Sequence, residues 1–115
     1  MQTREISKTE WRNFFDRFSL EHQGWTATLE VFGPDIGAQQ EGSELPFEGV
    51  SVGSHDDDSE TIIVAIGKSA DDHISHTIEK PTRVWLEEAS EGAGAALEIE
   101  SEDQSKTLLR FRSRE

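Results

Sequence analysis

The sequence predicts an α+β domain in which an N-terminal helix packs on a curved antiparallel sheet or small open barrel of six or seven strands. Aromatic residues recur at helical spacing near the N-terminus, and from Trp25 onward apolar and polar residues alternate with a period of two. Clusters of Gly, Pro and Asp separate the alternating runs. A length of 115 residues suits one domain, so we expect residues 1–115 to form a single domain with one core.

The predicted helix covers about residues 7–22. Ser7 and Glu10 have the S-x-x-E spacing of a capping box, in which each side chain bonds a backbone N–H at the start of a helix. Gly24 suits the left-handed residue that commonly follows the end of a helix. These two signals predict where the helix begins and where it ends.

One side of this helix carries an aromatic stripe. Its members have the spacing i, i+3, i+4 and i+7: Trp11, Phe14, Phe15 and Phe18. Such a stripe could bind a partner, but at this spacing it is more typical of the side of a helix that faces a core. We therefore expect the stripe to be core, and Leu20 to extend it.

The strands are expected between residues 25 and 113. Residues 25–31 alternate between apolar and polar, which predicts a half-buried strand, whereas residues 60–66 are apolar on both faces, which predicts a central strand. Residues 36–47 follow no clear pattern, and residues 54–59 are expected to form a solvated loop. Further strands are predicted at residues 50–52, 74–78, 82–88, 97–100 and 109–112.

The alternation also predicts how the last strands pair. Pairing Leu86 with Leu97 keeps the apolar residues of both strands on one face. The outer residues then pair as Arg83 with Glu100 and Trp85 with Glu98. In the last hairpin, a turn of three or five residues again keeps the apolar residues on one face.

Arg110 and Arg112 then lie on the outer face beside Glu98 and Glu100. Cross-strand pairs of opposite charge contribute about 0.2–1 kcal/mol each. The basic residues near the C-terminus are therefore expected to neutralise these two glutamates.

The outer face of these strands is the candidate interaction face, formed by Arg83, Trp85, Glu98, Arg110 and Arg112. Tryptophan and arginine are enriched at binding hot spots, which favours a role in protein contact. The alternative is that Trp85 is covered within the molecule, either by the N-terminal helix or by a guanidinium stacked on its ring.

The charge of the chain bears on its partners. Twenty-four acidic residues against eleven basic ones give a formal net charge of −13. Phosphate backbones and anionic membranes repel such a surface, so neither nucleic acid nor membrane is expected as a partner. One hypothesis is that this acidity reflects adaptation to high salt. The other is that this is an ordinary acidic protein with no such adaptation. A melting temperature that stays flat or falls in molar NaCl would exclude the first.

No targeting or membrane segment is evident. The first 24 residues lack the apolar stretch of a signal peptide, and the longest aliphatic run, residues 62–66, is far shorter than the ~20 residues that span a bilayer. A cytoplasmic location is therefore expected.

The sequence contains no recognisable catalytic or metal-binding motif. There is no cysteine, no phosphate-binding glycine loop and no G-x-S-x-G elbow. His73 and His76 stand three apart, a spacing that sends side chains to opposite faces of a strand. The acidic run 56–58 lacks the alternating ligands and central glycine of a calcium loop. We therefore expect no catalytic, cofactor-binding or metal-ligating residue, and no cofactor.

Several short strings are familiar together. They are residues 33–39 (GPDIGAQ), residues 75–78 (SHTI) with Pro81 and Val84, residues 108–111 (LLRF) and the helix opening at residues 11–15 (WRNFF). With these strings the chain resembles a small prokaryotic family of domains of unknown function. The resemblance implies a stand-alone single-domain protein without an assigned activity, so it assigns no catalytic residue.

The sequence thus favours a non-enzymatic interaction or self-association domain that binds a protein partner or a second copy at the candidate interaction face. The alternative is a small-molecule binder or hydrolase with a cavity inside the barrel near His76. An apolar pocket with His76 and an acidic residue converging on it would favour this alternative.

Overall fold

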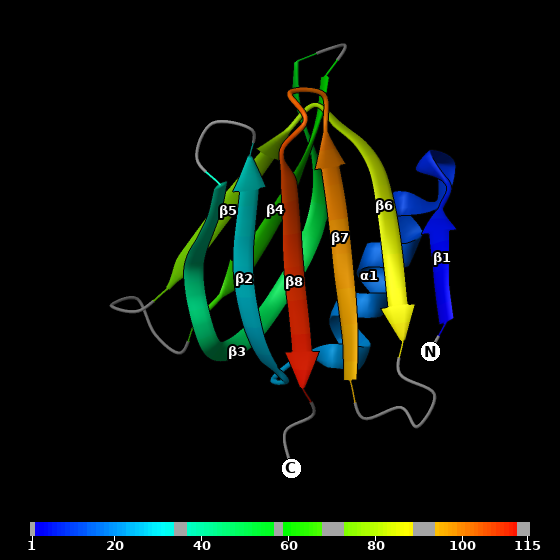
Figure 1. The fold of residues 1–115 in the computed structure, drawn as a ribbon. Coiled ribbons are helices and arrows are strands. Elements are labelled where there is room, and N and C mark those ends of the chain that lie inside the picture. Colours follow the sequence, from blue (N-terminus) through cyan, green and yellow to red (C-terminus); the bar gives the residue numbers. More distant parts are fainter. Residues whose placement is uncertain (1, 34–36, 57–58, 68–72, 89–93, 113–115) are drawn as a thin grey trace.

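The computed structural model describes residues 2–33, 37–56, 59–67, 73–88 and 94–112 (Figure 1). A 3-10 turn, η1 (Lys8–Glu10), is followed by one helix, α1 (Trp11–His22). The strands of these residues are β1 (Gln2–Ile6), β2 (Thr26–Gly33), β3 (Gly37–Asp56), β4 (Ser59–Ile66), β5 (Ile74–Glu79), β6 (Pro81–Glu88), β7 (Gly94–Ser101) and β8 (Lys106–Arg112).

The strands form one antiparallel sheet with the order β1-β6-β7-β8-β2-β3-β4-β5. Its two edges are β1 and β5, so the sheet is open (Figure 1). The predicted α+β class with an antiparallel sheet is confirmed. The predicted number of six or seven strands was wrong, because the described residues contain eight strands. The unexpected strand is β1, which precedes the helix and pairs with β6. Five residues at a sheet edge are too few to show a clear period.

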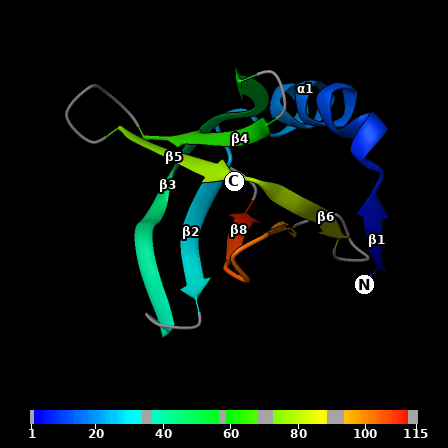
Figure 2. The same cartoon turned by 90° about the horizontal axis from the view of Figure 1, so that it is seen from above.

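The sheet bends along β3, which is 20 residues long. Residues 37–46 of β3 pair with β2, and residues 47–56 pair with β4. Shifts in register mark irregularities in both parts, and such bulges bend a strand. In Figure 2, β4 and β5 consequently run across the direction of β2 and β8. The bulges also break the period-two pattern, which is why residues 37–47 could not be assigned from the sequence.

The predicted loop at residues 54–59 was also wrong in part. The paired residues of β3 and β4 continue to Asp56 and resume at Ser59, so only residues 57–58, which lie outside the described residues, separate the two strands. The short strand predicted at residues 50–52 is likewise one part of β3.

The helix begins later than the capping box predicted. No capping bond from the Ser7 side chain is present among the described residues; instead the Glu10 N–H donates to the Ser7 carbonyl over 2.8 Å, which closes the 3-10 turn. The α-helix proper begins at Trp11. Its predicted end is confirmed, because α1 ends at His22 and Gly24 has a φ of 86°, in the left-handed region.

The helix packs its aromatic stripe into the core, as predicted. Trp11, Phe15 and Phe18 are buried, and Phe14 packs against the core from its edge. The Phe18 ring lies 5.1 Å from that of Phe111 in β8 and 6.1 Å from that of Phe47 in β3, centroid to centroid. The expectation that Leu20 extends the stripe was wrong: Leu20 is 78% exposed on the outer side of the helix.

The inner face of the sheet supplies the rest of the core. Its buried side chains are Ile6, Ala27, Leu29, Phe47, Val50, Ile62, Val64, Ile66, Ile78, Val84, Leu86, Leu97, Ile99, Leu109 and Phe111. The period-two prediction for the last strands is therefore confirmed, with Leu97, Ile99 and Leu109 fully buried. The residues between them point to the outer face.

Candidate functional site

The predicted register of the outer face is confirmed where β6 meets β7. Arg83 pairs with Glu100 and Trp85 with Glu98. Because Val84 and Leu86 are buried on the inner face, Arg83 and Trp85 point outward. The five residues of the candidate interaction face thus lie on one side of the sheet. The helix packs on the other side, so α1 does not cover Trp85.

The ion pairs of β8 differ from the prediction. The hairpin between β7 and β8 is closed by Ser101 N–H donating to the Ser105 carbonyl over 3.0 Å, with three residues, 102–104, between these two. This turn keeps the apolar residues on one face, as predicted, but sets Glu98 opposite Leu108 and Glu100 opposite Lys106. The expected pairing of these two glutamates with Arg110 and Arg112 was therefore wrong.

The two arginines instead contact glutamates of β2 and β3. Arg110 Nη1 lies 3.4 Å from Glu30 Oε1, and Arg112 Nη2 donates to Glu44 Oε1 over 2.6 Å. The reason is topological: β2 lies along the other edge of β8, and β3 lies beyond β2. The sequence predicted that β7 is a neighbour of β8, but not that β2 is the neighbour on the other edge of β8.

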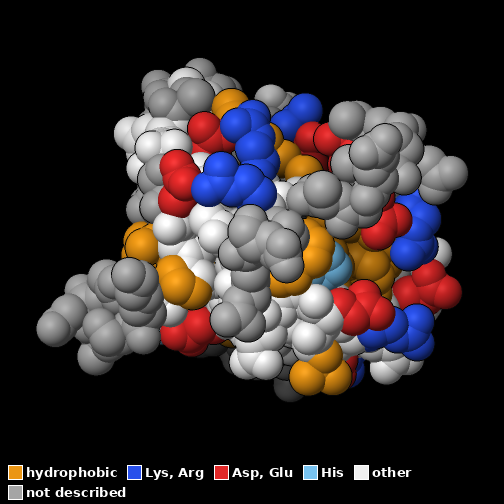
Figure 3. Space-filling model, turned by 90° about the horizontal axis from the view of Figure 1, so that it is seen from below, with side chains coloured by type: hydrophobic (Ala, Val, Ile, Leu, Met, Phe, Trp, Pro, Cys, Tyr) orange, Lys and Arg blue, Asp and Glu red, His pale blue; other side chains and the backbone are white. Residues whose placement is uncertain are grey.

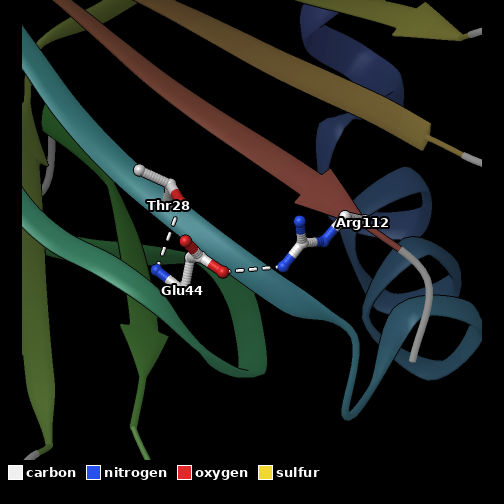
Figure 4. A network of polar contacts seen from close by, with 3 residues as sticks. All are labelled: Thr28, Glu44 and Arg112. Atoms are coloured by element: carbon white, nitrogen blue, oxygen red, sulfur yellow. Dashed lines mark hydrogen bonds and ion pairs between the residues drawn. The ribbon is translucent and has the colours of Figure 1, made fainter. Parts of the chain in front are cut away.

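Glu44 is held in an irregular part of β3. Its φ of 53° is unusual for a residue with a side chain, and it lies where the register between β2 and β3 shifts. Its N–H donates to Thr28 Oγ1 over 3.2 Å while its carboxylate accepts from Arg112 (Figure 4). The backbone and side chain of one residue thereby connect the three strands β3, β2 and β8.

Trp85 lies in a hollow of the outer face, which we call the Trp85 hollow. This hollow has a volume of ≈ 300 Å³ and is lined by Thr3, Trp85, Glu87, Ala96, Glu98, Glu100 and Leu108. The Trp85 side chain is half-buried, with Glu5 of β1 opposite it on one side and Glu98 of β7 on the other. An aromatic ring with one accessible part is thus surrounded by carboxylates.

The carboxylates of this hollow interact with one another. Burial raises the pKa of Glu98 above its ordinary value of 4.5, and this effect is opposed by the positive charge of Lys106, 3.8 Å away. A hydrogen bond with Glu100 and the charges of Glu100 and Glu87 raise the pKa of Glu98 further. Negative charge is therefore in excess around Trp85, even with Lys106 nearby.

His73 and His76, the histidines singled out in the sequence, lie in different surroundings. His73 Nε2 lies 3.2 Å from Glu48 Oε1 at the surface, whereas His76 is half-buried in β5 and pairs with Val64 of β4. Residues 57–58 and 71–72, part of the acidic runs, lie outside the described residues. Within the described ranges, no group of three or more His, Asp or Glu could hold a metal ion.

Sequence reasoning missed a fourth buried aromatic ring of α1, that of His22. His22 is 9% exposed, and its Nδ1 donates to the Phe18 carbonyl over 3.0 Å. It continues the buried stripe of Trp11, Phe15 and Phe18 at i+11 from Trp11. That spacing is the signal by which the sequence could have placed His22 in the core.

No helix in the described part of the chain is long and apolar enough to cross a membrane.

Comparisons with known proteins agree with the resemblance seen in the sequence. The model of the family of unknown function DUF5335 matches residues 2–115. An uncharacterized protein of Aquifex aeolicus (strain VF5) is 28% identical over 112 residues, which cover 97% of this chain and 94% of that protein. No solved structure matches. The chain belongs to the DUF5335 family, whose function is unknown.

Proposed function

We propose that this protein is a non-enzymatic interaction domain that binds a basic segment of a partner protein at the Trp85 hollow. The observation that carries the proposal is the position of Trp85: it is half-buried on the face of the sheet opposite α1, among Glu87, Glu98 and Glu100. A flat, partly accessible indole is the kind of side chain that dominates binding energy in protein interfaces.

The charge around the indole favours a cationic partner. A lysine or arginine side chain placed over Trp85 would gain a cation–π contact of about 0.5–2 kcal/mol. The same cation would reduce the repulsion among the carboxylates that raises the pKa of Glu98. Both interactions arise beside Trp85, so one basic side chain would stack on the indole and also reduce the repulsion among the carboxylates.

A second copy of the chain is the less favourable occupant. Each copy has a formal charge of −13, and like charges on two copies repel. Arg110 and Arg112, the basic residues that could offset this on the same face, already contact Glu30 and Glu44. Self-association at this face is therefore an outcome to be tested rather than the proposal itself.

The test is a titration with a synthetic Lys/Arg-rich peptide, followed by NMR through the indole N–H signal of Trp85. Saturable shifts are expected at Trp85 and its neighbours in β6 and β7. Trp85→Ala should weaken binding about tenfold or more. Glu98→Gln should weaken it less. Glu79→Gln serves as the matched control, because Glu79 is an exposed acid on β5, at the other edge of the sheet.

Three results would overturn the proposal. Shifts spread over all acidic surfaces, unchanged by Trp85→Ala, would mean nonspecific charge attraction. An acidic peptide of the same length that binds equally well would exclude charge recognition. A dimer in light scattering that Trp85→Ala converts to a monomer would assign the face to self-association instead.

A further inference from the structure

A second hollow lies on the inner side of the sheet, at the seam between α1, β1 and β6. This seam pocket has a volume of ≈ 440 Å³ and is lined by residues that include Arg4, Ile6, Phe14, Arg17, His22 and Leu86. Ile6 and Leu86 belong to the inner face, so the pocket is separated from the Trp85 hollow by the thickness of the sheet. Its volume is in the range of small-molecule sites.

His22 brings an unused polar atom to this pocket. A carbonyl oxygen only accepts hydrogen bonds, so Nδ1 carries the hydrogen that His22 donates to Phe18. Nε2 has no hydrogen-bond partner among the described residues. Nε2 is also not buried from solvent. Among the described residues, Glu30 Oε1 is the only side-chain nitrogen or oxygen atom that is buried from solvent and has no hydrogen-bond partner. Nε2 of a side chain that is 9% exposed therefore reaches solvent in the pocket that His22 lines.

The imidazole of His22 is fixed by its aromatic neighbours. Its centroid lies 3.9 Å from that of Phe18 in a stacked arrangement, and 4.5 Å and 5.6 Å from those of Trp25 and Phe111. A ring held on several sides loses little freedom when it forms a new hydrogen bond, and this lowers the cost of binding. Figure 3 shows hydrophobic side chains gathered on the face seen from below, with acidic and basic groups around them.

Two guanidinium groups line the same pocket from different elements. Arg4 comes from β1, and its Cζ lies 5.8 Å from the centroid of the Phe14 ring; Arg17 comes from α1. Within the described residues, neither forms an ion pair with a carboxylate. By contrast, Lys106, Arg110 and Arg112 on the outer face are each paired with a glutamate.

From this arrangement we propose that the seam pocket binds a small carboxylate with an apolar body. The carboxylate accepts hydrogen bonds from Arg4 and Arg17, a geometry for which the guanidinium is well suited. The apolar body packs on Phe14, Phe18 and Leu86, and a hydroxyl or amino group of the ligand hydrogen-bonds His22 Nε2. Glu10, Glu21 and Glu88 also line the pocket, so an ammonium group on the ligand would find carboxylates nearby.

The probes are 3-phenylpropanoate, L-phenylalanine and the neutral 3-phenylpropanamide. Binding is followed by NMR shifts of the backbone amides and by calorimetry. Both carboxylates are expected to shift signals of α1, β1 and the end of β6, and the amide to bind about tenfold more weakly. If L-phenylalanine binds more tightly than 3-phenylpropanoate, the pocket also recognises the amino group. If the two bind equally, the pocket recognises the carboxylate and not the amino group.

The variants separate the roles of the lining residues. Arg17→Ala should weaken carboxylate binding about tenfold. Arg12→Ala, an exposed arginine of the same helix that does not line the pocket, should have no effect. His22→Asn retains a donor near the Phe18 carbonyl but removes Nε2. It should therefore weaken the binding of L-phenylalanine more than the binding of 3-phenylpropanoate. Circular dichroism establishes that each variant is folded.

The proposal is overturned if no probe shifts the seam residues, if the neutral amide binds as well as the carboxylates, or if Arg12→Ala and Arg17→Ala have equal effects. It is independent of the proposed function. Trp85→Ala should leave carboxylate binding unchanged, and Arg17→Ala should leave binding of the basic peptide unchanged, so either proposal can fail alone.

Discussion

Arg112 and Glu44, which are 68 positions apart in the chain, are joined by a 2.6 Å hydrogen bond that passes over β2. Glu44 also bonds the side chain of Thr28 in β2 through its backbone N–H. The three residues hold β8, β2 and the irregular part of β3 together shortly before β3 changes its pairing partner after Pro46.

The left-handed backbone of Glu44 should make substitutions there depend on more than the lost ion pair. Glu44→Ala loses the bond to Arg112 and keeps a strained φ, so we expect it to destabilise the fold by about 0.2–1 kcal/mol, the range for an exposed pair. Glu44→Gly also loses that bond, but it relieves strain of about 1–2 kcal/mol. Glu44→Gly should therefore be more stable than Glu44→Ala in urea denaturation.

Arg112→Ala is the matched control, because it removes the same ion pair without changing the backbone at position 44. Its effect should equal that of Glu44→Ala within error. If Glu44→Gly proves less stable than Glu44→Ala, the positive φ of Glu44 does not cost free energy in the folded protein.

The raised pKa of Glu98 should make stability depend on pH. The folded state binds this proton more tightly than the unfolded state, so the stabilising contribution of protonated Glu98 is complete below its ordinary pKa of 4.5. This contribution is lost as the pH rises through the higher pKa of the folded state. Glu98→Gln, which cannot ionise, should therefore raise the free energy of unfolding at pH 7 and have little effect at pH 4.

The size of this gain is modest, about 0.5 kcal/mol or less, because 37% of the Glu98 side chain is exposed and solvent screens its charge. Urea denaturation at several pH values measures it directly. Lys106→Ala is the informative second variant: removing the charge that lowers the pKa of Glu98 should raise that pKa further in an NMR titration. A pKa that falls instead would contradict the assigned causes.

Phe18 and Leu20 test the orientation of the helix. Phe18 contacts Phe47 and Phe111 from the two parts of the sheet, so Phe18→Ala should cost about 3–5 kcal/mol, as expected for removing a buried ring. Leu20→Ala, two residues away but 78% exposed, should change stability by less than about 0.5 kcal/mol. Thermal unfolding of the two variants compares them. Equal losses would mean that the helix presents a different side to the core.

The sequence alone predicted the features that depend on local periodicity. The buried positions of α1 except His22, the inner residues of β6, β7 and β8, and the pairing of Trp85 with Glu98 all follow from repeats of 3.6 or two residues. These repeats state which side chains share a face, and burial of apolar surface then requires that face to be the inner one.

Tertiary structure decided which elements lie next to each other. Arg110 and Arg112 contact Glu30 and Glu44 because β2 occupies the free edge of β8, and Trp85 lies beside Glu5 because β1 pairs with β6. The seam pocket likewise arises where a helix meets two strands. Which strands become neighbours depends on the free energy of the whole sheet, to which pairings between distant residues contribute. A local sequence pattern does not contain this information.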